Sequence, residues 1–242
     1  MPALNTAQPL HGQIRDWLRG KILDGSYPPD SKLPSEQALM TQFSVSRITV
    51  RHALGVLAQE GQVFKVAGKG CFVAKPKPAQ ALARLEGFAE AMRSQGYQAY
   101  NRVVSVQTLA ANPAVAHALA LAEGDAVVEI RRVRYLDQQP VSVDVTYVHP
   151  PLGERLAGAD LAGRDIFDIL ENDYQIALGY AQLSIDAVSA DSGLAAQLDV
   201  AVGAPLIHLE RMTYRKDGQP LELDDIHYRG DRFRYRLRID RE

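Results

Sequence analysis

Hydrophobic residues near the start of the chain recur at the spacing of an α-helix. Leu10, Ile14, Leu18 and Ile22 follow one another at intervals of four residues, which places them on one side of a helix. The pattern predicts an amphipathic helix that ends near Gly25. Its apolar side needs partners to pack against, and two further helical patterns follow it.

The second helical pattern begins after Ser35. The Ser35 hydroxyl can accept a free backbone N–H of an opening helical turn, and Ala38, Leu39 and Phe43 give the short helix an apolar side. Residues 44–45 then form a tight turn. This spacing predicts a first helix of a helix-turn-helix motif.

The third helical pattern begins after Ser46, a second N-cap candidate, and ends at Gly61. One side is a buried stripe of Val50, Leu54 and Leu57. The other side begins with polar and basic residues, namely Arg47, Thr49, Arg51 and His52. A helix of this kind can place its first turns in the major groove of DNA, where arginine can bond guanine or a phosphate.

A glycine-turned hairpin follows the third helix. Residues 62–66 and 71–74 read as paired strands, and residues 67–70 (Ala-Gly-Lys-Gly) read as the turn, where glycine permits positive φ. Lys69 at its tip can reach a phosphate or a minor groove. The Cys71 side chain is predicted to pack against its surroundings as part of a strand. Together the elements predict a winged helix-turn-helix.

Four motifs in order, LPSE (33–36), SVSRITVRHAL (44–54), EG (60–61) and GKGCFV (68–73), resemble the DNA-binding domain of GntR-type bacterial transcription regulators. The resemblance implies DNA contacts by matching positions, which are Ser46, Arg47, Thr49, Arg51, Gly68 and Lys69. Without that series, the two arginines would read as ordinary surface charges. Ser35, Gln37 and His52 complete the candidate set, His52 as a neighbour of the interface rather than a base reader. Gln37 stands where many relatives carry arginine, which implies either a different operator or an affinity that depends on fewer ion pairs with DNA.

The rest of the chain predicts a second domain. We expect residues 1–9 to be disordered, residues 10–75 to form the DNA-binding domain, residues 76–81 to be a stiff proline-containing linker, and residues 82–242 to form the second domain. Its helical patterns cover residues 82–95, 112–121, 166–171 and 192–198. Its strand patterns cover residues 102–109, 126–135, 141–149, 183–190, 206–215, 221–228 and 233–239.

An internal repeat organises this second domain. Arg131, Asp137, Gln139 and Pro140 recur 80 residues later as Arg211, Asp217, Gln219 and Pro220. In both copies a small helix precedes a strand–turn–strand. Two such halves most simply form one antiparallel sheet with helices on its faces, an α+β fold, with clefts between the halves as natural ligand sites.

Two arginines interrupt an apolar strand. Arg132 and Arg134 are two residues apart, so both face the same side as Val128 and Ile130. Buried arginines require an anion, and Asp144 on the next strand is placed to supply one. Two interpretations stay open: a salt bridge between Arg134 and Asp144 with Arg132 in solvent, or an anion-binding cleft in which Glu222 and Tyr228 hold polar groups of a ligand.

Further motifs are similar to the UTRA effector domain of the HutC branch of GntR regulators: LARLEGFAEAMRSQG (82–96), EIRRVRYLDQQPVSVDVTYV (129–148), DIFDILENDY (165–174) and the segment 205–235. The resemblance implies a chorismate lyase-like fold, a small-metabolite effector and a homodimer. It also implies effector contacts by Phe88, Arg132, Arg134, Asp144, Glu222 and Tyr228. Relatives that bind sugar phosphates often have hydroxyls where this chain has Ala89 and Asp165. We therefore expect a carboxylate or mixed-charge effector, with Asp165 facing it.

Composition fits this division. The net charge of the 242 residues is −2, but residues 1–78 hold 10 Lys/Arg and 5 Asp/Glu, whereas the remainder holds 17 and 24. Only the first domain is therefore suited to phosphates. The single cysteine excludes an intramolecular disulfide and is typical of the cytoplasm. There is no signal-peptide pattern, and no apolar run of about 18 residues that could span a membrane.

The favoured function is a DNA-binding transcription regulator, most simply a repressor that a small metabolite releases from a palindromic operator. One alternative is an enzyme with a lyase-like pocket. No nucleophile–base pair and no metal-spaced His/Cys group supports it, so we predict no catalytic residue, cofactor or metal. The other alternative is an architectural DNA binder that responds to no effector.

Overall fold

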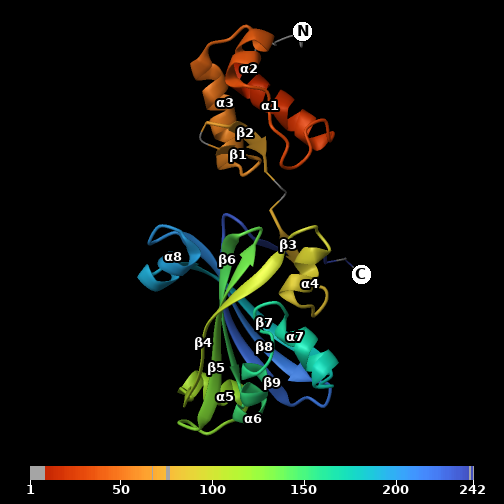
Figure 1. Ribbon diagram of the computed structural model, residues 1–242, viewed down its shortest axis with the longest axis vertical. Helices are drawn as coiled ribbons and strands as arrows, with labels where there is room; N and C mark the ends of the chain where they lie inside the picture. Colours follow the sequence, from red (N-terminus) through yellow and green to blue (C-terminus); the bar gives the residue numbers. More distant parts are fainter. Residues whose placement is uncertain (1–8, 67, 75–76, 240, 242) are drawn as a thin grey trace. The chain divides into compact units, whose positions relative to one another are not determined.

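The computed structural model describes residues 9–66, 68–74, 77–239 and 241. The chain divides into two compact units, Met1–Lys77 and Pro78–Glu242 (Figure 1). Most of the expected disordered N-terminus, part of the expected linker and Ala67 of the expected wing turn lie outside the described residues. Within them, no helix has the length and hydropathy needed to cross a membrane.

The N-terminal unit is the predicted winged helix-turn-helix. It consists of α1 (Leu10–Leu23), α2 (Glu36–Phe43), α3 (Arg47–Gln59), β1 (Val63–Val66) and β2 (Gly70–Val73). Both predicted N-caps are confirmed, because the Ser35 hydroxyl accepts from the Ala38 N–H at 3.1 Å and the Ser46 hydroxyl accepts from the Thr49 N–H at 3.3 Å. The caps fix where α2 and α3 begin.

One apolar core holds this unit together. The i+4 stripes of α1 and α3 supply its centre, with side chains fully or almost fully buried: Ile14, Leu18, Leu39, Phe43, Val50, Leu54, Leu57, Val63 and Val73. Burial of each such side chain contributes roughly 1.5–3 kcal/mol. The thiol of Cys71 joins the same core, as predicted. The polar side of α3 is consequently left facing outward.

The wing is a two-stranded antiparallel hairpin in which Val66 pairs with Gly70. Its turn uses glycine as predicted, since φ is +71° at Gly68 and +118° at Gly70. Residues 30–33 run along the other side of β2, where the Leu33 N–H donates to the Cys71 carbonyl at 2.8 Å. The hairpin is therefore supported on both sides of β2.

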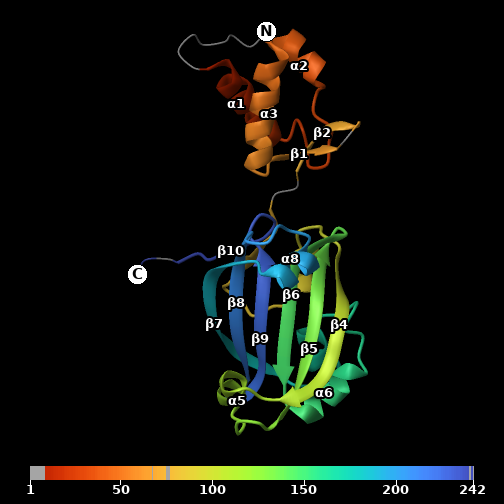
Figure 2. The same cartoon turned by 90° about the vertical axis from the view of Figure 1, so that its left-hand side faces the viewer.

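The C-terminal unit is built on a six-stranded antiparallel sheet in the order β4-β5-β6-β9-β8-β7 (Figures 1 and 2). The predicted α+β class is confirmed. The order follows the internal repeat, because β4-β5-β6 and β7-β8-β9 are equivalent halves that meet where β6 pairs with β9. The strands are β4 (Ala99–Ala110), β5 (Ala126–Leu136), β6 (Gln139–Val148), β7 (Leu178–Ser189), β8 (Pro205–Arg215) and β9 (Pro220–Arg229).

Helices cover the two faces of this sheet unequally. One face, the pocket face, is covered by α4 (Phe88–Arg93), α6 (Pro150–Ala157), α7 (Ile166–Asp168) and a π-helical turn (Ile169–Asp173). On the other face, α5 (Pro113–Leu119) packs at one end and α8 (Ser192–Leu198) at the opposite end (Figure 2). The middle of that second face carries polar side chains.

Several predicted elements differ in extent. The helix predicted over residues 82–95 is wrong in its first half, because α4 begins at Phe88. A long-range pairing prevents an earlier start: β3 (Ala79–Ala81) runs parallel to β10 (Arg234–Arg236), and the Leu82 N–H donates to the Arg236 carbonyl at 2.9 Å. The strand predicted over residues 233–239 is shorter in the structure, where it is β10. Residues 79–81, which were expected to belong to the linker, form β3.

Candidate DNA-reading helix and effector pocket

The outward side of α3 presents the residues predicted to read DNA. Arg47, Arg51 and His52 are exposed, and Thr49 is half-buried. The Thr49 hydroxyl lies 2.9 Å from the Ser46 hydroxyl, so both side chains take part in the helix cap. Arg51 lies 3.8 Å from the Glu36 carboxylate, a long ion pair that leaves its guanidinium accessible.

Ile48 is a candidate that the sequence reasoning missed. It lies in the first turn of α3 between Arg47 and Thr49, and its side chain is 81% exposed. An apolar side chain in this position suits the methyl group of thymine. The helical periodicity could have predicted this exposure, because Ile48 is two residues from Val50 and therefore does not belong to the buried stripe of Val50, Leu54 and Leu57.

The remaining candidates of the N-terminal unit are also on the surface. Ser35, Gln37, Gly68 and Lys69 are exposed, and the Ser35 hydroxyl is engaged in its cap. The ring of His52 stacks on that of His11 at 4.2 Å. That His52 borders a DNA interface stays a prediction.

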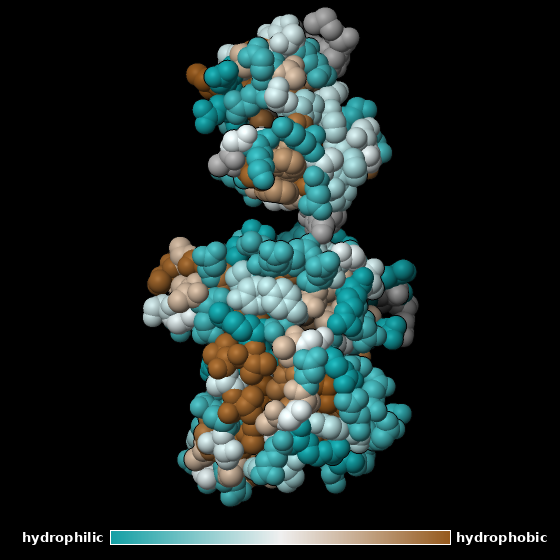
Figure 3. Space-filling model, in the orientation of Figure 1, coloured by the Kyte–Doolittle hydropathy of each residue, from teal (hydrophilic) through white to brown (hydrophobic). Residues whose placement is uncertain are grey.

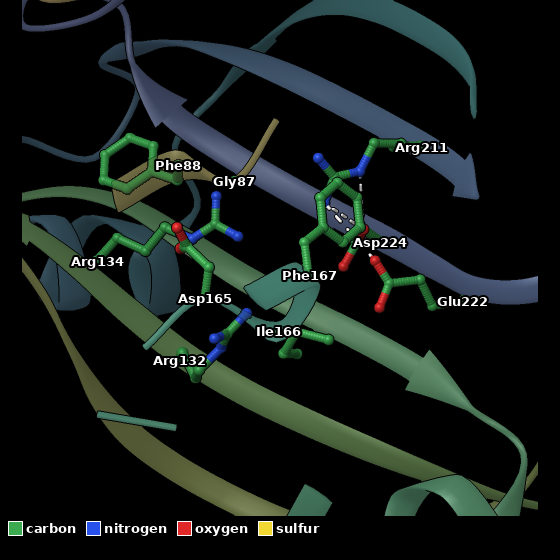
Figure 4. Close-up of a pocket in the computed structure, with 10 residues that line it drawn as sticks. All are labelled: Gly87, Phe88, Arg132, Arg134, Asp165, Ile166, Phe167, Arg211, Glu222 and Asp224. Atoms are coloured by element: carbon green, nitrogen blue, oxygen red, sulfur yellow. Dashed lines mark hydrogen bonds and ion pairs between the residues drawn. The ribbon is translucent and has the colours of Figure 1, made fainter. Parts of the chain in front are cut away.

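The C-terminal unit contains a pocket on the pocket face of its sheet (Figure 4). Five of the predicted effector residues line it, and the remaining two, Asp144 and Tyr228, form hydrogen bonds with its arginines. The full lining is Gly87, Phe88, Arg132, Arg134, Asp165, Ile166, Phe167, Arg211, Glu222 and Asp224.

Both arginines of β5 share one carboxylate. Arg132 Nη2 donates to Asp144 Oδ2 at 2.6 Å, and Arg134 Nη2 donates to the same oxygen at 2.7 Å. Arg134 Nη1 also donates to the Tyr228 hydroxyl at 3.2 Å, and its guanidinium lies over the ring of Phe88. The interpretation that placed Arg132 in solvent is wrong, because Arg132 is 1% exposed.

A second arginine–carboxylate pair lies across the pocket. Arg211 donates to Asp224 Oδ2 through Nε at 3.0 Å and through Nη2 at 2.7 Å, and it stacks on Phe167. The Thr146 hydroxyl donates to Asp224 Oδ1 at 2.6 Å. Sequence reasoning missed this pair, although the repeat held the signal: Asp224 stands 80 residues after Asp144, and Arg211 was already part of the repeat.

Asp165 caps α4 from a distance in sequence. Its Oδ2 accepts from the Ala89 N–H at 2.8 Å and from the Glu90 N–H at 3.2 Å. The carboxylate approaches so closely that a Cβ on Gly87 would overlap it. Figure 4 shows the Asp165 carboxylate beside the guanidinium of Arg134. The two N–H groups at the start of α4 thus already hold an anion belonging to the chain.

The pocket balances its own charges. Burial, followed by the neighbouring Asp224 carboxylate, raises the pKa of Glu222 well above its usual value. Burial opposes ionisation of Asp224, but the adjacent Arg211, the Thr146 hydrogen bond and Arg134 together outweigh it, so the pKa of Asp224 is lowered. The guanidinium groups of Arg132, Arg134 and Arg211 are therefore matched by three aspartates, Asp144, Asp165 and Asp224, while the raised pKa of Glu222 favours its protonated form.

Several buried polar atoms of the pocket lack a hydrogen-bond partner among the described residues. These are Arg132 Nε and Nη1, Arg134 Nε, Asp144 Oδ1 and Glu222 Oε2. An unpaired buried donor or acceptor costs about 1–3 kcal/mol. A ligand with both acceptor and donor groups would recover that cost.

Glu222→Gln is expected to change how stability depends on pH. The carboxyl titrates near 4.3 when unfolded and higher when folded, so the folded chain binds more protons between these two values. Wild-type stability should therefore fall as pH rises through the folded pKa. Glutamine is neutral throughout, so the variant's melting temperature should rise relative to that of the wild type as the pH increases. The melting temperatures of both proteins are measured from about pH 4 to 8. A difference between them that stays constant over this range would contradict the prediction.

Comparisons with known proteins cover both units. Residues 10–73 match the family described as bacterial regulatory proteins, gntR family, and residues 94–234 match the UTRA domain. The chain is 32% identical over 233 residues to the HTH-type transcriptional repressor NagR of Bacillus subtilis (strain 168), covering 96% of each sequence. It is 26% identical to the histidine utilization repressor of Pseudomonas aeruginosa, covering 85% of this chain and 82% of that one.

A solved structure shows the same arrangement of elements. The crystal structure of PhnF from Mycobacterium smegmatis matches with a TM-score of 0.66 at 28% sequence identity, covering 95% of this chain and all of that one. The matches extend over both the helix-turn-helix and the sheet that holds the pocket. The two resemblances found in the sequence thus apply to nearly the whole chain.

Proposed function

Because the chain belongs to the GntR family of bacterial regulatory proteins and joins its DNA-binding domain to a UTRA effector domain, we propose that it is a transcriptional repressor released from its operator by a small metabolite. One observation supports this most: a pocket of buried arginines with unpaired donors is present in the same chain as an exposed arginine-bearing helix. The relatives named above are repressors. Operator release by a metabolite that binds the chain tests the proposal.

In this proposal α3 reads the operator. Arg47 and Arg51 bond guanine or phosphate, and Ile48 contacts a thymine methyl group in the major groove. Gln37 bonds adenine or phosphate, and Lys69 at the wing tip contacts a phosphate or the minor groove. Ser35, Ser46, Thr49 and Gly68 shape the backbone that presents these side chains.

A homodimer would place two such helices on a palindromic operator with half-sites about one helical turn apart. Apolar side chains on the edge strands of the sheet support a self-association surface. Figure 3 shows a hydrophobic patch where β4 runs, and the exposed apolar residues of the two edge strands are Tyr100, Val103, Val104, Val106, Tyr180, Leu183 and Ile185. A cytoplasmic location follows from access to the chromosome.

The effector in this proposal carries a carboxylate or mixed charges rather than a phosphate. Asp165 supports this, because it satisfies the helix-terminal N–H groups that are otherwise suited to a phosphate. The balance of three guanidinium groups against three aspartates also leaves no excess positive charge for a dianion. Release of DNA follows only if the effector binds the DNA-incompetent arrangement better.

Asp165→Ser combined with Ala89→Ser should convert the pocket's preference. Removing the carboxylate frees the N–H groups of Ala89 and Glu90 and adds two hydroxyl donors. We expect the affinity for a hexose 6-phosphate to rise at least tenfold, which corresponds to about 1.4 kcal/mol, as measured by isothermal titration calorimetry. Asp160→Ser is the matched control, because Asp160 caps the Gly163 N–H on an exposed loop.

The wild-type protein should bind a member of a carboxylate and amino-acid library instead. If only phosphorylated sugars bind the wild type, the effector assignment is overturned while the repressor proposal stands. A lyase-like activity is a separate hypothesis, which a turnover assay on candidate carboxylates tests.

A further inference from the structure

Two histidines and an aspartate gather on the face of the sheet opposite the pocket. Asp225 and His227 alternate along β9 with the pocket-face residues Asp224, Ile226 and Tyr228, so they point to the other side. His208 of β8 is the direct partner of His227 in the strand register. Figure 2 shows this face between α5 and α8, where no described helix covers the strands.

The three side chains converge. His227 Nδ1 lies 3.0 Å from Asp225 Oδ1, and His208 Nε2 lies 3.4 Å from the same oxygen. The two imidazole rings stack with centroids 4.6 Å apart and an interplanar angle of 25°. One ligand atom of each residue lies within 4.8 Å of the others.

These separations fit a metal ion. Two ligands bound to zinc at about 2.0–2.1 Å in tetrahedral geometry lie roughly 3.4 Å apart. Two imidazoles with one carboxylate form a ligand set suited to zinc and neighbouring transition metals rather than to magnesium or calcium, which prefer oxygen. We propose that His208, Asp225 and His227 form a binding site for a divalent transition-metal ion of the zinc class.

A fourth residue is placed to orient the site. Asp186 Oδ2 on β7 lies 4.0 Å from His208 Nδ1, the ring nitrogen that faces away from Asp225. At this distance Asp186 is not hydrogen-bonded to the ring, but its negative charge favours a proton on Nδ1, which leaves the Nε2 lone pair for the metal. Among the described residues, His208 Nε2 and Asp225 Oδ1 form no hydrogen bond of good geometry, so both atoms are available to a ligand.

The three side chains are partly exposed, although the His208 Nε2 and Asp225 Oδ1 atoms themselves are buried. The side chains of His208, His227 and Asp225 are 22%, 18% and 42% exposed. Three protein ligands leave a fourth tetrahedral position for water. Binding would tie β8 and β9 together on the face directly behind Asp224 and Tyr228.

Sequence reasoning predicted no metal, because the six histidines are scattered along the chain. The strand pattern nevertheless held a signal, since Asp225 and His227 are two residues apart on one strand and must share a face. The contribution of His208 depends on the register of β8 against β9, which the sequence does not give.

The test uses the full-length chain without a histidine tag, stripped with EDTA and titrated separately with Zn²⁺ by calorimetry and with Co²⁺ by visible absorption. We expect one ion per chain and the intense d–d bands of tetrahedral Co²⁺. Each of His208→Gln, Asp225→Asn and His227→Gln should lower the affinity at least tenfold. His117→Gln on α5 and His52→Gln beside His11 are the controls and should bind as the wild type does.

Far-UV circular dichroism confirms that each variant is folded. The proposal is overturned if the wild type binds neither ion, because the cluster is then a plain ion-paired His–Asp–His group. It is also overturned if each of the three single variants binds the ion with wild-type affinity. Loss of binding in His52→Gln alone would assign the ion to the His11–His52 pair instead.

Discussion

Asp144→Asn is expected to destabilise the C-terminal unit by about 3–5 kcal/mol, because it removes the negative charge shared by two buried guanidinium groups. The substituted amide would retain the shape of the side chain but would leave one buried positive charge of the Arg132–Arg134 pair without a matching carboxylate. A loss of this size lowers the melting temperature by roughly 6–20 °C for a unit of this length. Differential scanning calorimetry of the full chain measures it.

Asp217→Asn is the matched control for that substitution. Asp217 lies 3.7 Å from Arg215, but its side chain is 51% exposed, so its ion pair contributes little. We expect the control to melt with the wild type. Equal melting temperatures for Asp144→Asn and the wild type would show that the two arginines are not held by Asp144.

Arg47→Ala and Arg51→Ala should each weaken operator binding by on the order of 1–3 kcal/mol. Both side chains are exposed at the start of α3, so their removal should leave the fold intact while deleting a base or phosphate contact. Fluorescence anisotropy at two salt concentrations distinguishes the two roles, because loss of a phosphate contact also reduces the salt dependence of binding.

Arg215→Ala is the control for the DNA-binding variants, since Arg215 is a half-exposed arginine of the C-terminal unit. It should bind DNA with wild-type affinity and salt dependence. If Arg47→Ala and Arg51→Ala also bind as the wild type does, α3 is not the reading helix.

The sequence predicted the N-terminal unit well because its signals are local. Ser35 and Ser46 cap helices through N–H groups three residues away, and the turn of the wing is encoded by Gly68 and Gly70, two residues apart. In the C-terminal unit the internal repeat predicted the symmetric sheet. The pairing of β3 with β10 joins segments more than 150 residues apart in the sequence, and no local pattern encodes it. Sequence reasoning assigned no element to α6, which begins with Pro150 and Pro151, although proline is tolerated at the first helical turn.

The sequence predicted part of the candidate pocket, namely the residues that one hairpin brings together. Alternation along one strand placed Arg132 and Arg134 on the same face, and the hairpin placed Asp144 opposite them. Whether Arg132 was buried depended on the helices that cover that face, which lie elsewhere in the chain. The role of Asp165 as a cap for Ala89 spans 76 residues, so only the folded structure reveals it.

The most direct test of the repressor proposal is fluorescence anisotropy with the DNA immediately upstream of the chain's own gene. The measurement is made at two salt concentrations, with and without a library of carboxylate, amino-acid and phosphorylated metabolites. We expect tight, salt-sensitive binding of two chains per palindromic site, relieved by one metabolite of the carboxylate or mixed-charge class. Tight binding that no metabolite relieves would contradict the effector role of the pocket, and failure to bind any upstream fragment would contradict the repressor proposal itself.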